Sequence, residues 1–343
     1  MRIHRYSCGS ISLDQQRYAL NIVKCYNLPE SPWGVPQFRE TPAPTDYVFT
    51  KENRPTEEQQ LEIASRFKGL HFRSAVCSIL YLAFGTRADI MFITCKLSKA
   101  CHNPGIKDYQ ALLWLFGYLR KYPDFGIKYY NDVKQSPIYR IMKERKIPFS
   151  ELVTLTDTSW GDCPDTSRST AGELAFVQGG YVAAKSHVPT PIAMSSAEAE
   201  YMSAASGCMT TSHIRMILYD HKHLGTKRYN IIDQVLDMAP SILMVDNQAA
   251  VQMGMNDKLT KLTRHIARRF HYVREGVRSG AHKLYWIPKE YQLSDILTKT
   301  QAASIANPLR DQALFRLPQF LANPSYAQVV TGRRDSRGVT EPE

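Results

Sequence analysis

Four acidic residues stand at positions from which carboxylates commonly do chemistry. Asp157 ends a β-branched run, LVTLTD, and Asp246 ends a short apolar run, ILMVD, each typical of a buried strand. Glu200 lies one turn into a predicted long helix that starts at Ser195, and Asp295 lies in the last predicted helix. In open α/β sheets, sites gather at the carboxyl ends of strands, so Asp157 and Asp246 meet there if their strands are parallel neighbours.

Such a set of carboxylates suits metal-assisted chemistry. Clustered acids cannot all stay ionised at contact distance without cations, and hard oxygen ligands suit Mg²⁺ or Mn²⁺. Two such ions about 3.5–4 Å apart are common machinery for phosphodiester hydrolysis. The simpler interpretation is that an Asp at a strand end forms a turn or caps a helix. Glu198, three residues after Ser195, fits a capping box and not a site.

Length and charge narrow the class of partner. The chain has 343 residues, enough for two compact domains, and 43% of them are apolar, so a core can form. Its net charge is +11, concentrated in the first 150 residues, which favours nucleic acid or another polyanion as a partner. No apolar run is long enough to cross a bilayer, so no membrane association is expected.

The seven cysteines form no C-x-x-C pair. Scattered cysteines in odd number argue against a structural zinc site and for a reducing compartment. We therefore expect a cytoplasmic location, with an assembled particle or the nucleus as alternatives.

The first part of the chain is predicted to be mostly helical. Capping-box patterns start helices at Ser12 and at Thr56. Further helices are predicted at 70–84, 87–101 and 105–121, followed by a strand at 126–130.

The second part changes to an α/β pattern. Its predicted order, β-β-β-α-β-α-α-β-α, indicates a mixed sheet with flanking helices. Gly179-Gly180 marks a hairpin between the second and third strands. The expected strands are 152–157, 171–178, 181–185, 242–246 and 282–287, and the expected helices are 195–223, 247–254, 263–278 and 290–300.

Several motifs together resemble one family. LVTLTDTSWGDCPDTSRSTAGELAFVQGG, SSAEAEYMSA, ILMVDNQAAV, RHIARRFHYVREGVRSG and YWIPKEYQLSDILTK are similar, in this order, to the ribonuclease H domain of copia-type retrotransposon Pol polyproteins. Upstream, FRSAVCSILYLAFGTRADIMFITCKLSKACHNPG resembles the region that joins polymerase to nuclease, and GSISLDQQRYALNIVKCYNL resembles the tail of the reverse transcriptase. The resemblance covers about residues 8–300.

The resemblance implies a ribonuclease H-like mixed sheet and cleavage of the RNA strand of an RNA–DNA hybrid. The family's catalytic and metal-binding acids fall on Asp157, Glu200, Asp246 and Asp295, which would hold two Mg²⁺ ions, with Mn²⁺ as an alternative. Two metals would activate a water and stabilise the leaving oxygen. The polymerase motif Tyr-x-Asp-Asp is absent, so no polymerase activity is expected.

The resemblance also implies a division of the chain. Residues 1–130 would be a reverse transcriptase tail, or thumb and connection remnant, and 131–149 a polar linker. Residues 150–305 would form the ribonuclease H-like domain, and 320–343 a loose tail. The implied partners are the RNA–DNA hybrid, nucleic acid in general and the remainder of the Pol polyprotein.

Basic residues near the predicted site are candidates for phosphate contacts. They are Lys185, Arg264, Arg268, Arg269 and Lys289. Many cellular relatives have a mobile His before the final Asp, and residues 288–294 contain none. Partial substitution for that His by Lys289 is one interpretation. A solvated basic face explains the arginines equally well.

Two other functions remain open from the sequence. One is a catalytically inactive remnant that binds nucleic acid without cutting it. The other is a related nuclease or integrase of the same fold, which usually completes its site with two Asp and one Glu. An acid at 295 together with Glu200 favours ribonuclease H.

Overall fold

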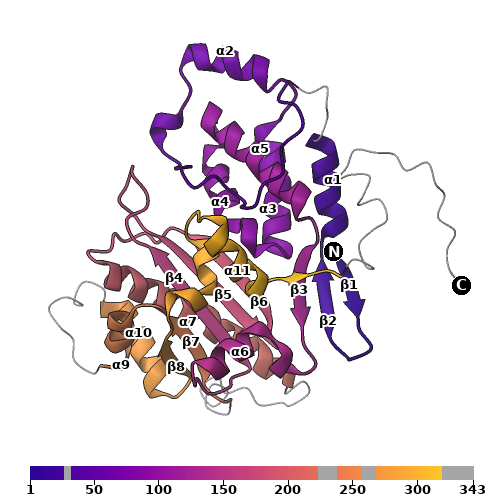
Figure 1. Ribbon diagram of the computed structural model, residues 1–343. Coiled ribbons are helices and arrows are strands. Elements are labelled where there is room, and N and C mark those ends of the chain that lie inside the picture. Colours follow the sequence, from indigo (N-terminus) through magenta and orange to yellow (C-terminus); the bar gives the residue numbers. More distant parts are fainter. Residues whose placement is uncertain (27–31, 223–237, 257–266, 319–343) are drawn as a thin grey trace, which may run out of the picture.

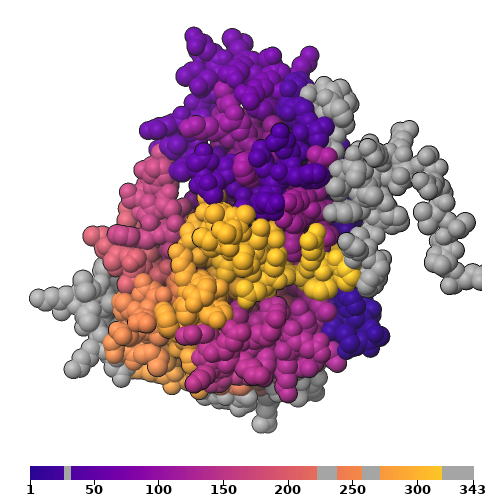
Figure 2. Space-filling model, in the orientation of Figure 1, coloured from indigo at the N-terminus to yellow at the C-terminus, as the bar shows by residue number. Residues whose placement is uncertain are grey.

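The computed structural model describes residues 1–26, 32–222, 238–256 and 267–318, which contain two β-sheets and their flanking helices (Figure 1). The N-terminal helices stand at one end of the molecule, next to the larger sheet. In the space-filling view, the yellow segment near the C-terminal end of the described chain lies between the indigo N-terminal region and the magenta segment around α6 (Figure 2). Segments far apart in the sequence therefore pack together.

The larger sheet has five strands in the order β6-β5-β4-β7-β8. They are β4 (Leu152–Ser159), β5 (Thr170–Val177), β6 (Gly180–His187), β7 (Ser241–Val245) and β8 (His282–Trp286). The first three are antiparallel neighbours, whereas β7 runs parallel to both β4 and β8. A three-strand meander extended by two parallel strands is the sheet of a ribonuclease H-like fold, so the predicted fold class is confirmed.

The hairpin between β5 and β6 is a two-residue turn. Gln178 and Gly179 have φ angles of 50° and 76°. Two successive positive φ angles make a type I′ turn, whose twist matches that of the flanking strands. The hairpin predicted from the glycine pair is thus present, with the turn one residue earlier.

Helices from the second part of the chain cover one face of this sheet. They are α7 (Ser196–Lys222), α9 (Gln248–Met255) and α10 (Ala267–Arg278). Leu243, Val245 and Leu284 of the sheet share a hydrophobic cluster with them. Ser195 Oγ accepts a hydrogen bond from Glu198 N at 3.2 Å, while the Glu198 carboxylate accepts one from Met194 N at 2.9 Å. Glu198 thus caps α7, as expected, although its partner is one residue before Ser195.

The first part of the chain covers the opposite face. Its helices are α1 (Gln16–Tyr26), η1 (Lys51–Asn53), α2 (Glu57–Arg66), α3 (Phe72–Gly85), η2 (Ala88–Ile90), α4 (Met91–Ala100) and α5 (Ile106–Lys121). Ile79 and Leu115 of these helices belong to the same buried cluster as Leu155, Phe176 and Met244 of the larger sheet. One continuous core therefore joins the two parts.

The smaller sheet corrects the expectation for the N-terminus. Its antiparallel strands are β1 (Arg2–Arg5), β2 (Ile11–Asp14), β3 (Phe125–Tyr129) and β9 (Phe315–Arg316), in the order β1-β2-β3-β9. The predicted helix start at Ser12 is wrong, because Ser12 pairs with Lys128 inside β2. The helix starts later, where Asp14 Oδ1 accepts a hydrogen bond from Gln16 N at 2.9 Å. The capping box at Thr56 is confirmed.

Residues 131–149 are not a plain polar linker. They contain η3 (Val133–Gln135) and α6 (Pro137–Glu144), which Ser136 caps through its side chain. Ile138, Ile141 and Met142 of α6 are buried in the common core. Charged residues separate these apolar positions, which is why the sequence predicted a linker and not a short helix. The division of the chain into domains stays a prediction.

The predicted helix at 290–300 is also wrong. In its place are two 3₁₀ turns, η5 (Lys289–Tyr291) and η6 (Leu293–Leu297), followed by an unexpected helix α11 (Ala303–Ala313). The buried Gln292 side chain donates to Thr156 O at 2.9 Å, and this contact with the sheet fixes the chain between the two turns. The tail predicted at 320–343 lies outside the described residues.

None of the helices in the described part of the chain combines the length and the apolar character needed to span a bilayer.

Candidate metal centre

Asp157 and Asp246 emerge side by side from two parallel strands. The register of β4 and β7 pairs Thr156 with Val245, and the residue that follows each of these two in the chain is an acid. Corresponding residues of parallel neighbours lie at the same edge of the sheet, where α/β proteins commonly bind ligands. Asp157 is buried and Asp246 is partly exposed.

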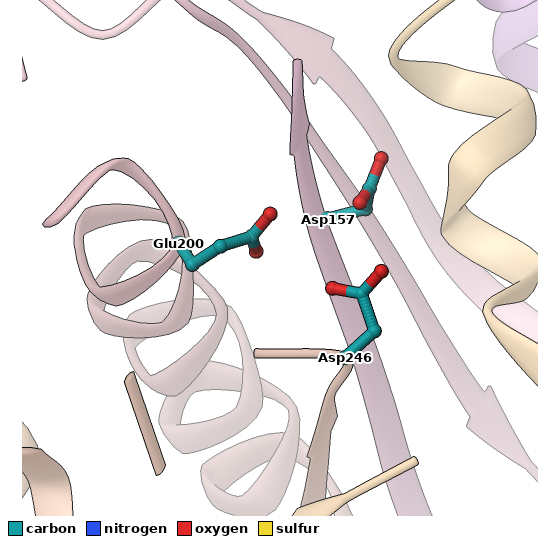
Figure 3. A group of neighbouring side chains, drawn as sticks. All are labelled: Asp157, Glu200 and Asp246. Atoms are coloured by element: carbon teal, nitrogen blue, oxygen red, sulfur yellow. The ribbon is translucent and has the colours of Figure 1, made fainter. Parts of the chain in front are cut away.

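Glu200 reaches the same place from α7, and its side chain points toward the two aspartates (Figure 3). Its Oε1 accepts a hydrogen bond from Thr158 N at 3.1 Å. Thr158 Oγ1 donates to Ala199 O, and Ser203 Oγ donates to Asp157 O, each at 3.2 Å. These bonds hold the start of α7 against β4 and so fix the Glu200 carboxylate opposite the strand end.

Asp157, Glu200 and Asp246 form a compact group, here called the carboxylate triad, whose ligand oxygens all lie within 4.8 Å of one another. Burial, assisted by the charge of Asp295, raises the pKa of Asp157 to about 7. Burial and the charge of Asp157 raise the pKa of Glu200 well above its ordinary value. Burial and the charge of Asp295 also raise the pKa of Asp246. The triad therefore resists full ionisation unless a cation is supplied.

A buried oxygen of the triad lacks a hydrogen-bond partner in the described part of the chain. Glu200 Oε2 is buried and makes no hydrogen bond with the residues that the structure describes. A buried carboxylate oxygen without a partner is costly. Oxygen ligands in a crowded anionic group fit Mg²⁺ or Mn²⁺ by charge and by donor type. The residues present therefore fit the metal that the resemblance implies.

Asp295, the fourth predicted acid, lies next to Asp157 but outside the triad. It is fully buried in η6. Lys299 Nζ donates to its Oδ1 at 2.6 Å, and Gln301 Nε2 donates to its Oδ2 at 2.8 Å. Lys299 Nζ also lies 3.6 Å from Asp157 Oδ2. Both oxygens of Asp295 thus have partners from the protein, in contrast to Glu200.

Gly172 lets the segment that contains Asp295 and Thr298 approach the larger sheet. Gly172 of β5 is the register partner of Asp157. A Cβ atom at Gly172 would lie 2.7 Å from Thr298 Cγ2 and 2.9 Å from Leu297 Cβ. The close approach allows Thr298 Oγ1 to donate a hydrogen bond to Asp157 Oδ2 at 2.5 Å. The missing side chain of Gly172 thus contributes to the position of the first acid.

The predicted phosphate-binding residues differ in their surroundings. Lys289 is exposed, and its charge acts on Asp246 to lower that residue's pKa against the stronger effects of burial and Asp295. Lys185 Nζ donates to Thr210 Oγ1 at 2.6 Å and lies 3.4 Å from the buried Glu173. Arg264 lies outside the described residues, as do the side chains of Arg268 and Arg269.

Sequence reasoning missed Lys299, Thr298 and Gln301. All three follow Asp295 within six residues, and the motif LSDILTK contains the first two. Burial opposes the charged form of Lys299, but the charges of Asp157 and Asp295 prevail and raise its pKa. The i,i+4 spacing of Asp295 and Lys299 was a usable signal only if the segment was helical, and nothing local tied the lysine to Asp157.

Comparisons with known proteins bear on the whole chain. No family model matches it. It is 27% identical over 289 residues to the retrovirus-related Pol polyprotein from transposon RE1 of Arabidopsis thaliana, and 28% identical over 290 residues to that from transposon RE2 of the same plant. Each match covers 84% of this chain, which spans only 17% of the length of each relative.

A solved structure with a likeness to this chain is the N-terminal ribonuclease H domain of rv2228c from Mycobacterium tuberculosis, determined as a fusion with maltose binding protein. It is 14% identical, has a TM-score of 0.28, and the match covers 47% of this chain and 94% of that one. At that TM-score the likeness adds nothing to the fold assignment, which rests on strand order and direction.

Proposed function

We propose that this chain is a metal-dependent ribonuclease H. As its motifs predicted, it is related over 84% of its length to retrovirus-related Pol polyproteins of copia-type transposons. Its substrate would be the RNA strand of an RNA–DNA hybrid, cut during reverse transcription of a retrotransposon. The observation that carries the proposal is the carboxylate triad, which three separate elements bring to one edge of the larger sheet.

In this proposal Asp157 belongs to two groups of contacts. It forms the triad with Glu200 and Asp246, and it shares the Lys299 ammonium group with Asp295. Two bound Mg²⁺ ions, or Mn²⁺ in their place, would activate a water for in-line attack and stabilise the leaving 3′-oxygen. The protein would hold the acids at fixed positions through the hydrogen bonds that Thr158, Thr298 and Ser203 donate to Glu200 and Asp157.

The proposed substrate agrees with the charge of the chain. The net charge of +11 favours a polyanionic partner. Lys289, exposed near Asp246, is a candidate contact to the phosphate backbone. Lys185, Arg264, Arg268 and Arg269 stay predicted contacts. The remainder of a Pol polyprotein is a proposed partner, and a cytoplasmic location stays a prediction.

A cleavage assay on an end-labelled RNA–DNA hybrid tests the function. We expect Mg²⁺ to support cuts in the RNA strand and excess chelator to abolish them. Double-stranded RNA and double-stranded DNA of the same sequence should stay intact. Cleavage of double-stranded DNA instead would favour a related nuclease or integrase of the same fold.

Asp246→Asn should abolish hybrid cleavage while hybrid binding is largely retained. Glu290→Gln is a matched control, because Glu290 is an exposed acid in the adjacent η5 turn and is not part of the triad. If the wild-type chain binds the hybrid with steep salt dependence but cuts nothing at any Mg²⁺ concentration, the chain is an inactive nucleic-acid-binding remnant and the proposal is wrong.

A further inference from the structure

A lysine side chain already occupies one side of the proposed metal centre. Lys299 Nζ lies 2.6 Å from Asp295 Oδ1 and 3.6 Å from Asp157 Oδ2, so one ammonium group contacts two buried acids. Both acids are at most 2% exposed, whereas the lysine side chain is 29% exposed. A positive charge at this distance from two desolvated carboxylates does what a metal ion would do there, with one unit of charge instead of two.

We call the surroundings shared by Asp295 and Lys299 the Asp295 side of Asp157, and those shared by Glu200 and Asp246 the triad side. The contacts of the two sides differ. On the Asp295 side, Thr298 and Lys299 approach Asp157 Oδ2, and Gln301 holds the second oxygen of Asp295. On the triad side, Glu200 Oε2 has no hydrogen-bond partner among the described residues, and no lysine or arginine of the described residues forms an ion pair with Glu200 or Asp246. Glu200 and Asp246 are therefore the acids of the centre that still lack a cation in contact.

We propose that Lys299 is a positioning residue that serves as a tethered cation between Asp157 and Asp295. The chain alone then holds one divalent ion, at the triad, and a second ion binds on the Asp295 side only when the ammonium group moves away. The lysine can make that movement, because its side chain is partly exposed and it lies two residues beyond the end of the buried η6 turn. This inference rests on the proposed metal-dependent function and specifies the order in which its ions bind.

The test counts Mn²⁺ ions bound to the metal-free, full-length chain, by calorimetric titration and by the loss of the free-ion signal in electron paramagnetic resonance. We expect the wild-type chain to bind one Mn²⁺ with a second site at least about tenfold weaker. Lys299→Met should bring the two affinities together, because the competing charge is gone. Lys299→Arg keeps the charge and should behave like the wild type.

Lys68→Met is the matched control, since it removes one positive charge at an exposed position two residues after α2, outside the acid group. It should leave the difference between the two sites unchanged. If Lys299→Met does not fold, Lys299→Gln provides the same neutral test with a side chain that can still donate a hydrogen bond to Asp295.

The outcomes separate this inference from the function on which it rests. Two equal sites in the wild type, unchanged by Lys299→Met, would overturn the inference and leave the metal centre intact. Loss of bound Mn²⁺ in Lys299→Met would mean that the lysine is only a scaffold for the acids, which also overturns it. No bound ion in any variant would reject the metal centre itself and, with it, the proposed function.

Discussion

Two sites in this chain contain buried carboxylates in opposite surroundings. In the first part, Asp89 receives two hydrogen bonds from Arg87, at 2.9 and 2.7 Å, and one from Tyr118, at 2.7 Å. Burial opposes its ionisation, but the charge and hydrogen bonds of Arg87 prevail and lower the pKa of Asp89. In the triad, burial and like charges act together, and the pKa values are raised.

The comparison distinguishes a structural acid from a ligand-binding one. Asp89, Arg87 and Tyr118 are all buried, and they complete one another without any external group. The triad is incomplete, because Lys299 contacts only Asp157 among its three acids and the described residues supply no hydrogen-bond partner for Glu200 Oε2. Burial is common to both groups. They differ in the source of positive charge, which is Arg87 for Asp89 and an added cation for the triad.

Asp157→Asn should produce the largest effect on activity. Loss of a ligand shared by both sides of the centre is expected to lower hybrid cleavage by on the order of 10³-fold or more, measured as single-turnover rate. The metal-free variant should be at least as stable as the wild type, because one of the repelling charges is removed. A variant that unfolds easily in chelator would contradict this view of the triad.

Asp89→Asn should have the opposite profile. Removing one partner of a buried ion pair leaves Arg87 uncompensated and is expected to cost about 3–5 kcal/mol of unfolding free energy in urea denaturation. Mn²⁺ binding by the fraction that stays folded should be unchanged. Glu62→Gln is the control, because Glu62 forms an exposed pair with Arg66 and its loss should cost no more than about 1 kcal/mol.

The stability of the metal-free chain should fall as the pH rises from about 4 to about 7. The pKa of Asp157 lies near 7 in the folded chain against an ordinary value of 3.8, so the folded state binds the extra proton over that interval. Its contribution is present below pH 4 and is lost as the pH rises through 7, by roughly 2–4 kcal/mol. The unfolding free energy from urea titrations in chelator, plotted against pH, should fall more steeply for the wild type than for Asp157→Asn. Parallel profiles would mean that Asp157 is not the group that titrates.

A smaller effect is expected at the contact between the first part and the loop after β4. Lys96 Nζ of α4 donates to Asp162 at 2.7 Å and to Thr170 at 2.9 Å. Lys96→Met should cost about 1–2 kcal/mol, since the pair is largely buried. A double-mutant cycle with Asp162→Asn measures the coupling, and Lys68→Met, at an exposed position, should be neutral. No coupling energy would show that this contact does not join the two parts.

The sequence predicted what depends on local pattern. Asp157 and Asp246 could be placed because each ends an apolar run. The sequence left open whether those runs are parallel neighbours, which the pairing of β4 with β7 shows. Ser12 was misplaced because a strand that pairs with residues more than 100 positions away leaves a short local pattern that also suits a helix cap. Lys299 was missed because its contact with Asp157 spans the chain and depends on the tight fit of η6 against Gly172.

The central claim is that the triad is an acid group completed by a divalent cation. Thermal unfolding with Mg²⁺ raised from chelator to millimolar concentration tests it without any substrate. The account predicts that the melting temperature of the wild type rises with Mg²⁺, as expected for an ion that binds only the folded state, while Glu200→Gln with Asp246→Asn gives no rise. An unchanged melting temperature in the wild type, or an equal rise in both proteins, would contradict the account.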